Sequence, residues 1–127
     1  ADIILLGVSR CGKTPTCLYL ALQYGVKAAN YPLTEEDLDK LKIPDRILKH
    51  KHKVFGLTID PFRLSQIRSE RRAGTQYSNP RQCQREVSDA ESMYLRNGID
   101  FLSTTDTSIE EISGKVLQAL KLNNRLQ

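Results

Sequence analysis

The stretch ILLGVSRCGKTPTCLYLA, residues 4–21, decides the fold of this chain. Its apolar start ends at Gly7, which is typical of a buried parallel strand, and a helix is predicted over residues 13–24. Between them the sequence fits G-x-x-x-x-G-K-T, the pattern of a phosphate-binding P-loop. Backbone N–H groups and the helix N-terminus attract phosphates, Lys13 adds a mobile charge, and Thr14 offers a hydroxyl to Mg²⁺. The alternative is a plain glycine-rich turn with a surface lysine.

Two residues make this P-loop unusual. Arg10 places a charge inside the loop, and Pro15, directly after Thr14, has no backbone N–H to donate to a phosphate. We expect a loop without that donor to hold a diphosphate in a shifted register. Arg10 would then supply positive charge that the metal contacts of a third phosphate otherwise provide.

Predicted strands and helices alternate along the rest of the chain. Strands are predicted over residues 2–7, 26–33, 53–60 and 100–105, and helices over residues 13–24, 34–42, 62–72, 80–97 and 108–122. A capping box of Thr107 and Glu110 is predicted to open the last helix. The alternation predicts an α/β fold, specifically a P-loop kinase-like three-layer sandwich with a mostly parallel sheet. We expect residues 1–127 to form a single P-loop nucleotide-binding domain.

Composition excludes several classes of function. Charged residues make up 27% of the chain, and 19 Lys and Arg against 15 Asp and Glu give a net charge of +4. This mild excess suits nucleotide ligands, and no base-reading motif predicts nucleic-acid binding. No apolar run approaches the roughly 20 residues that span a membrane. Three cysteines without a C-x-x-C pair predict a reducing, cytoplasmic setting.

A second candidate site element is FGLTID, residues 55–60, an apolar strand that ends in an acid. In P-loop folds such a strand lies beside the P-loop strand, and its acid completes a metal site near the loop. Asp60 is therefore predicted to hold Mg²⁺ together with Thr14, or to accept a proton from a hydroxyl substrate. The alternative is an Asp-Pro turn that caps the following helix.

Four arginines crowd the end of the helix predicted over residues 62–72, namely Arg63, Arg68, Arg71 and Arg72. P-loop phosphotransferases commonly close an arginine over the transferring phosphoryl group, so Arg68 and Arg72 are catalytic candidates. A solvated basic helix end is the alternative. Tyr77, in the following loop, is predicted either to stack on a base or only to pack.

The segments GVSRCGKTPT, KAANYPL, FGLTIDPFRLSQIRSERR and SIEEISGKVL resemble the bacterial phosphoenolpyruvate synthase regulatory protein family. Regulatory proteins of pyruvate, phosphate dikinase are its relatives. The likeness covers nearly the whole chain, and because family members are about twice as long, this chain resembles their carboxyl-terminal half. Two departures are visible. Many members carry a hydroxyl residue where this chain has Gly12, and an acid where it has Phe62.

The resemblance implies a bifunctional serine/threonine kinase and pyrophosphorylase. It would use ADP to phosphorylate a threonine of phosphoenolpyruvate synthase, or of pyruvate, phosphate dikinase, and inorganic phosphate to reverse this with release of pyrophosphate. The family's ADP-binding segment falls here on Gly7, Val8, Ser9, Arg10, Cys11, Gly12, Lys13 and Thr14. An ATP-dependent small-molecule kinase and a non-catalytic nucleotide sensor are the alternatives. Self-association into a homo-oligomer is a further alternative.

Overall fold

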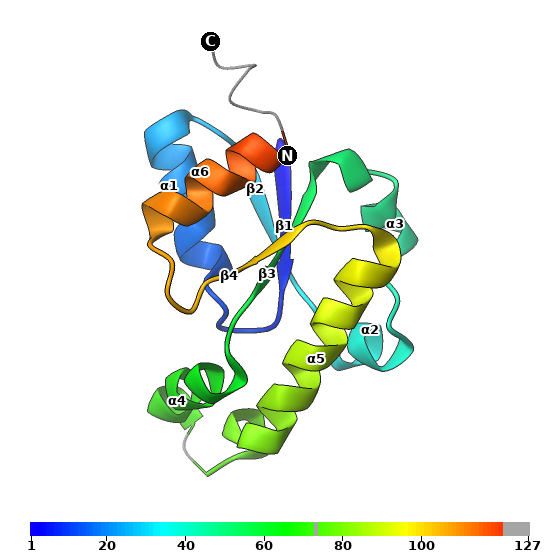
Figure 1. Ribbon diagram of the computed structural model, residues 1–127, viewed down its shortest axis with the longest axis vertical. Helices are drawn as coiled ribbons and strands as arrows, with labels where there is room; N and C mark the ends of the chain where they lie inside the picture. The colour runs from blue at the N-terminus through cyan, green and yellow to red at the C-terminus, as the bar shows by residue number, and fades with distance from the viewer. Residues whose placement is uncertain (73, 121–127) are drawn as a thin grey trace.

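The computed structural model describes residues 1–72 and 74–120, with Arg72 described by its backbone alone (Figure 1). In chain order the elements are β1 (Ile3–Gly7), α1 (Lys13–Tyr24), β2 (Ala28–Pro32), α2 (Glu35–Lys40), α3 (Asp45–Leu48), η1 (Lys51–Lys53), β3 (Val54–Thr58), α4 (Pro61–Arg72), η2 (Gln76–Ser78), α5 (Pro80–Asn97), β4 (Phe101–Ser103) and α6 (Ile109–Ala119). Among the described residues, no helix is long and apolar enough to cross a membrane.

The strands of the described residues form one parallel sheet in the order β2-β1-β3-β4. Every residue of β1 and β3 is buried, as expected for central strands covered on both faces. Helices α1 and α6 cover one face, and α2, α3 and α5 cover the other (Figure 1). The predicted α/β three-layer sandwich is therefore confirmed. Because the strands are parallel, their carboxyl ends share one edge of the sheet, and α4 lies beyond that edge.

Helix α5 packs closely against β3. The buried ring of Tyr94 lies directly over Gly56, and its hydroxyl donates to the carbonyl oxygen of Leu57 at 2.9 Å. A Cβ atom at position 56 would come within 2.7 Å of that ring, so only glycine fits there. This contact fixes α5, and therefore the residues that α5 presents near the sheet edge.

Local end signals explain most element boundaries. Helix α1 spans the predicted residues and stops at Gly25 in the left-handed conformation. Thr34 caps α2, and its side chain and that of Asp37 form a capping box. Asn79 caps α5, with Pro80 at the first helical position.

The predicted start of the last helix is wrong. Ser108, not Thr107, caps α6, and its Oγ accepts from the N–H of Glu111 at 3.2 Å. The hydroxyl of Thr107 donates instead to the carbonyl oxygen of Ser103 at 3.0 Å. Both residues can cap a helix, and the sequence spacing alone does not choose between them. Helix α3 and the short helices η1 and η2 were not predicted from the sequence, and the predicted end of the last helix, residues 121–122, lies outside the described residues.

Candidate active site

The P-loop connects β1 to α1 at the carboxyl edge of the sheet. Two of its residues have positive φ angles, 72° at Arg10 and 102° at Gly12, and the second favours glycine. Gly7 is needed for a different reason. A Cβ atom there would collide with the sulfur of Cys11 and press on the side chain of Lys13. The two glycines of the motif thus let the loop turn tightly and let Lys13 fold back over it.

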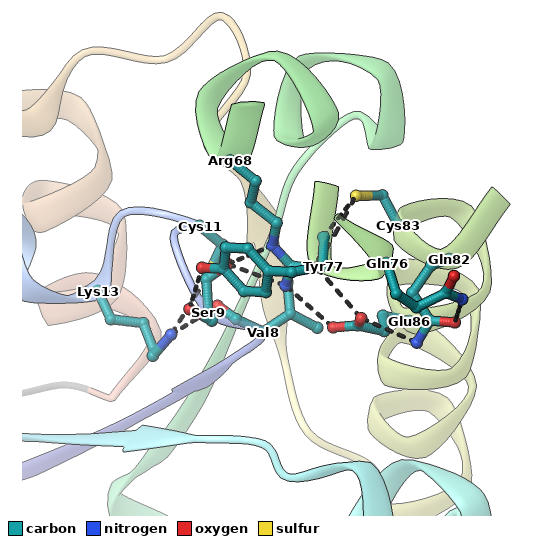
Figure 2. Close-up of polar contacts among 10 residues, drawn as sticks. All are labelled: Val8, Ser9, Cys11, Lys13, Arg68, Gln76, Tyr77, Gln82, Cys83 and Glu86. Atoms are coloured by element: carbon teal, nitrogen blue, oxygen red, sulfur yellow. Dashed lines mark hydrogen bonds and ion pairs between the residues drawn. The ribbon is translucent and has the colours of Figure 1, made fainter. Parts of the chain in front are cut away.

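Lys13 is buried at the mouth of this turn, with 4% of its surface exposed. Its Nζ donates to the carbonyl oxygen of Val8 at 2.6 Å and lies 3.8 Å from the sulfur of Cys11 (Figure 2). Burial lowers the pKa of Lys13 from its usual value and raises the pKa of the Cys11 thiol. Among the described residues no carboxylate pairs with this ammonium, so a phosphate would be its natural counter-ion.

Lys13 lines a cavity of about 370 Å³, which we call the Lys13 pocket. Its lining residues are Ser9, Arg10, Gly12, Lys13, Thr14, Pro15, Asn30, Pro32 and Ile67. The hydroxyl of Thr14 accepts from the side-chain amide of Asn30 at 2.9 Å. The sequence analysis missed Asn30, although a polar residue in the strand beside the P-loop strand was the available signal. The pocket therefore combines an ammonium, hydroxyls and an amide, groups that bind phosphates.

Arg68 lies behind the P-loop and not in this pocket. Its buried guanidinium donates to Ser9 O at 3.1 Å and to Tyr77 O at 3.0 Å. It also forms a bidentate ion pair with Glu86 of α5 at 2.9 and 3.1 Å, and it lies 4.3 Å from the centroid of the Tyr77 ring. Figure 2 shows Arg68 reaching from α4 between the loop and α5. We call Ser9, Arg68, Tyr77, Cys83 and Glu86 the Arg68 cluster.

This geometry does not match the predicted contact between Arg68 and a transferred phosphoryl group. The donors of the guanidinium already have partners, and about 1% of the side chain is exposed. Burial alone would lower the pKa of Arg68, but Glu86 more than offsets this and raises it. Glu86 sits far away in the sequence, and no sequence pattern pointed to it.

Two further contacts hold the P-loop. The hydroxyls of Ser9 and Tyr77 lie 2.7 Å apart, and Thr104 donates to Cys11 O at 2.8 Å. Tyr77 thus packs within the Arg68 cluster, which is the second of its two predicted roles. Side chains from outside the loop therefore satisfy the carbonyl oxygens of Ser9 and Cys11 and fix the shape of the loop.

Asp60 lies two residues beyond Thr58, the last residue of β3, which is the strand beside the P-loop strand; the strand was predicted to extend to Asp60 itself. Its carboxylate accepts from the N–H of Arg63 at 3.0 Å, which is the helix-capping contact of the alternative interpretation. Among the described residues lining the Lys13 pocket, Thr14 is present and Asp60 is not. The hydroxyl of Thr14 fits an Mg²⁺ site completed by phosphates and water. The metal role of Asp60 stays a prediction.

The other arginines lie at different places around the loop. Arg10 is exposed at the rim of the Lys13 pocket. Arg10 and Arg71 line a neighbouring hollow of about 380 Å³ together with Ser9 and Tyr77. The side chain of Arg72 lies outside the described part of the structure, so its catalytic role stays a prediction.

The fold and the loop together define an α/β P-loop fold with a polar pocket at the sheet edge. The model of the kinase/pyrophosphorylase family matches residues 1–117, and the chain belongs to that family. The resemblance seen in the sequence is therefore confirmed, and the family supports phosphotransfer in general.

Curated relatives extend this match. A protein of Alcanivorax borkumensis is 61% identical over 127 residues, which is all of this chain and 47% of the relative. One of Shewanella piezotolerans is 56% identical over 126 residues, 99% of this chain and 47% of the relative. Both are named "Putative phosphoenolpyruvate synthase regulatory protein". The chain spans about half the length of the curated relatives it matches.

Among solved structures, the fold is similar to that of the YorR protein from Bacillus subtilis, determined in complex with phosphorylated GDP. The TM-score is 0.68 with 12% sequence identity, and the match covers 97% of this chain and 98% of YorR. Identity this low shows the shared fold alone.

Proposed function

We propose that this protein regulates phosphoenolpyruvate synthase by reversible phosphorylation of a threonine, with ADP as donor in one direction and inorganic phosphate as acceptor in the other. The observation that carries the proposal is the buried ammonium of Lys13 at the mouth of the P-loop, which pairs with no carboxylate of the described residues. The family and the names of the relatives support the target. Pyruvate, phosphate dikinase is the second candidate target.

In the forward direction the threonine hydroxyl oxygen bonds to the β-phosphorus of ADP. The bond from that phosphorus to the bridging oxygen breaks, AMP leaves, and the hydroxyl proton passes to a base or to water. In the reverse direction an oxygen of inorganic phosphate attacks the phosphorus of phosphothreonine, whose P–O bond to threonine breaks. Pyrophosphate and the free hydroxyl are the products. Both directions pass through similar charge on one phosphoryl group, so one set of cations serves both.

The residues have separate roles in this scheme. The segment from Gly7 to Thr14 wraps the β-phosphate, and Lys13 neutralises the charge that develops on it. Mg²⁺, bound through Thr14 and in our proposal Asp60, would neutralise further charge on the phosphates. Arg10 and Arg71 are the arginines best exposed to contact a phosphate near the loop, and they replace Arg68 in this role.

The proposed setting is the cytoplasm, because the cysteines at positions 11, 17 and 83 are all free thiols.

Mass mapping tests the proposal directly. The protein is incubated with purified phosphoenolpyruvate synthase, ADP and Mg²⁺, and the modified residue is located by mass spectrometry. We expect one phosphothreonine, formed with AMP and removed on addition of phosphate with release of pyrophosphate. A parallel reaction with pyruvate, phosphate dikinase decides between the two targets.

Two results would replace the proposal. Faster transfer from ATP than from ADP, to a small molecule, would support an ordinary P-loop kinase. Tight ADP binding without transfer to either dikinase would support a nucleotide sensor.

A further inference from the structure

The segment that joins β4 to α6, residues 103–108, carries a hydroxyl group at five of its six positions. Two of these hydroxyls, those of Thr104 and Thr105, bond to parts of the candidate active site outside the segment. The other three bond within the segment or cap α6, namely those of Ser103, Thr107 and Ser108. The segment therefore contains two adjacent side chains whose contacts serve something other than its own shape.

Thr104 acts on the P-loop. Its Oγ1 donates to the carbonyl oxygen of Cys11 at 2.8 Å, and its own backbone N–H donates to the carbonyl oxygen of Thr58 at 2.8 Å, so β3 holds Thr104 in place. Because the peptide bond is planar, the C=O of Cys11 and the N–H of Gly12 point in opposite directions. Anchoring the carbonyl therefore also fixes the direction of the N–H of Gly12, a residue that lines the Lys13 pocket.

Thr105 acts on Asp60. Its Oγ1 accepts from the N–H of Asp60 at 2.7 Å and from the hydroxyl of Ser103 at 3.1 Å. Ser103 pairs with Thr58 at the end of the ladder between β3 and β4, so Thr105 and Asp60, each two residues further on, lie at the same level. There a side-chain hydroxyl takes the N–H that a backbone carbonyl would accept if the ladder continued. The hydroxyl of Thr105 thus fixes the backbone from which the carboxylate of Asp60 extends.

We propose that Thr104 and Thr105 are positioning residues that together set the separation between the P-loop and Asp60. The two are neighbours in the chain, so one peptide unit connects both contacts. Thr104 aligns the N–H of Gly12 for a phosphate, and Thr105 aligns the carboxylate of Asp60 for Mg²⁺. Phosphoryl transfer depends on such alignment, since a misplacement of about 1 Å can cost about a hundredfold in rate. The assignment rests on the proposed function, in which Asp60 binds Mg²⁺.

Two binding measurements test the two threonines separately and without turnover. Calorimetric binding of pyrophosphate in the absence of Mg²⁺ reports on the P-loop, and the Mg²⁺ affinity of the ADP-bound protein reports on Asp60. Thr104→Val keeps the shape of the side chain but removes the hydroxyl, so it should weaken pyrophosphate binding by about tenfold, the size of one hydrogen bond. Thr105→Val should weaken Mg²⁺ binding by about tenfold and leave pyrophosphate binding within about twofold.

Serine variants and a neighbouring threonine provide the controls. Thr104→Ser and Thr105→Ser keep the hydroxyl, so both affinities should return to within about twofold of the unmodified protein. Thr107→Val removes a hydroxyl of the same segment that donates to the carbonyl oxygen of Ser103 at 3.0 Å. Both affinities should be unchanged in that variant.

Unchanged pyrophosphate binding in Thr104→Val would overturn the role of Thr104, and unchanged Mg²⁺ affinity in Thr105→Val would overturn that of Thr105. A loss that the serine variants do not restore would also overturn the assignment, because packing and not the hydroxyl would then matter. Thermal unfolding shows whether each variant is folded, and an alanine variant replaces any valine variant that is not. If no transfer occurs with either dikinase but both binding differences are observed, the proposed function fails and the positioning roles stand.

Discussion

The two sides of the P-loop are built on opposite principles. Behind the loop, Arg68 is buried with its donors satisfied by Ser9, Tyr77 and Glu86. At the open side, Lys13 is buried without a carboxylate and Arg10 is exposed without a partner in the described residues. The residues that hold the P-loop in place are therefore different from the residues that face the pocket. The ion-paired guanidinium of Arg68 fixes the loop, and the charges of Lys13 and Arg10 are available to a ligand.

The largest effect should come from the open side. Lys13→Ala removes the charge that faces the transferred phosphoryl group, so both activities should fall by about a hundredfold to a thousandfold. Initial rates of phosphothreonine formation and of pyrophosphate release measure this. Lys42→Ala, at an exposed lysine outside the pockets, is the control. Undiminished ADP-dependent transfer in Lys13→Ala would refute the assignment of this side to chemistry.

Arg68→Ala should destabilise the protein by disrupting the contacts behind the P-loop. It leaves Glu86 without its buried partner and frees Ser9 O, so the free energy of unfolding should fall by about 3–5 kcal/mol. Urea unfolding measures this change. Arg71→Ala, one turn away and exposed, should change stability by less than about 0.5 kcal/mol. If Arg68→Ala were as stable as the unmodified protein and lost only phosphate-dependent activity, Arg68 would belong to the chemistry after all.

Substitutions of Asp60 show whether this residue binds Mg²⁺ or only caps α4. Asp60→Asn keeps a side chain that caps helices well, so α4 should stay intact. If Asp60 binds Mg²⁺, this change lowers Mg²⁺-dependent turnover by about tenfold to a hundredfold at unchanged melting temperature. Asp60→Ala should in addition lose about 1 kcal/mol of stability with the cap. Normal turnover in Asp60→Asn would leave Asp60 with the capping role only.

The burial of Lys13 can be tested through the pH dependence of the unfolding free energy. Burial lowers the pKa of Lys13 below 10.5, so between its folded pKa and 10.5 the unfolded chain binds more protons. The unfolding free energy should therefore rise with pH across that window, by at most about 1.4 kcal/mol per pH unit. Lys13→Met lacks this contribution. The difference in stability between the two proteins should be largest at neutral pH, in favour of Lys13→Met, and should narrow towards pH 10.5. A difference in unfolding free energy that stays constant with pH would mean that burial does not lower the pKa of Lys13.

The smallest effect is expected at Pro15. Pro15→Ala restores a backbone N–H at the start of α1, and we expect the preference for ADP over ATP to fall a fewfold, on the order of one hydrogen bond. Competition between the two nucleotides in a transfer assay measures the preference. An unchanged ratio would make Pro15 only a compatible residue for the first helical turn.

Local patterns predicted most of the fold from the sequence. The P-loop motif placed β1 and α1, and the helices predicted over residues 13–24 and 80–97 match α1 and α5, whose ends lie at Gly25, Asn79 and Gly98. These signals work because each depends on residues a few positions apart. Helix α3 is only Asp45–Leu48, too short to show a period, and it was missed.

The candidate site was predictable only in part. Lys13 and Thr14 carry a motif, so their place in the pocket followed from the sequence. Arg68 was predicted to contact the transferred phosphoryl group, but the structure buries it against Glu86, a partner that packing alone brings to it. Asn30 likewise meets Thr14 only through the register of β2 against β1. Contacts between distant segments leave little trace in one sequence.

The parallel strand order has a consequence for how this protein is made. In β1, Ile4 pairs with Val54 of β3, and Ser9 is anchored by Arg68, which lies 59 residues further along the chain. During synthesis β1 can pair with β2 first, but its other neighbour β3 and the Arg68 contact to Ser9 follow only later along the chain. Such long-range pairing slows folding and exposes the nascent chain to aggregation. The P-loop therefore reaches its final contacts only after α4 has been made.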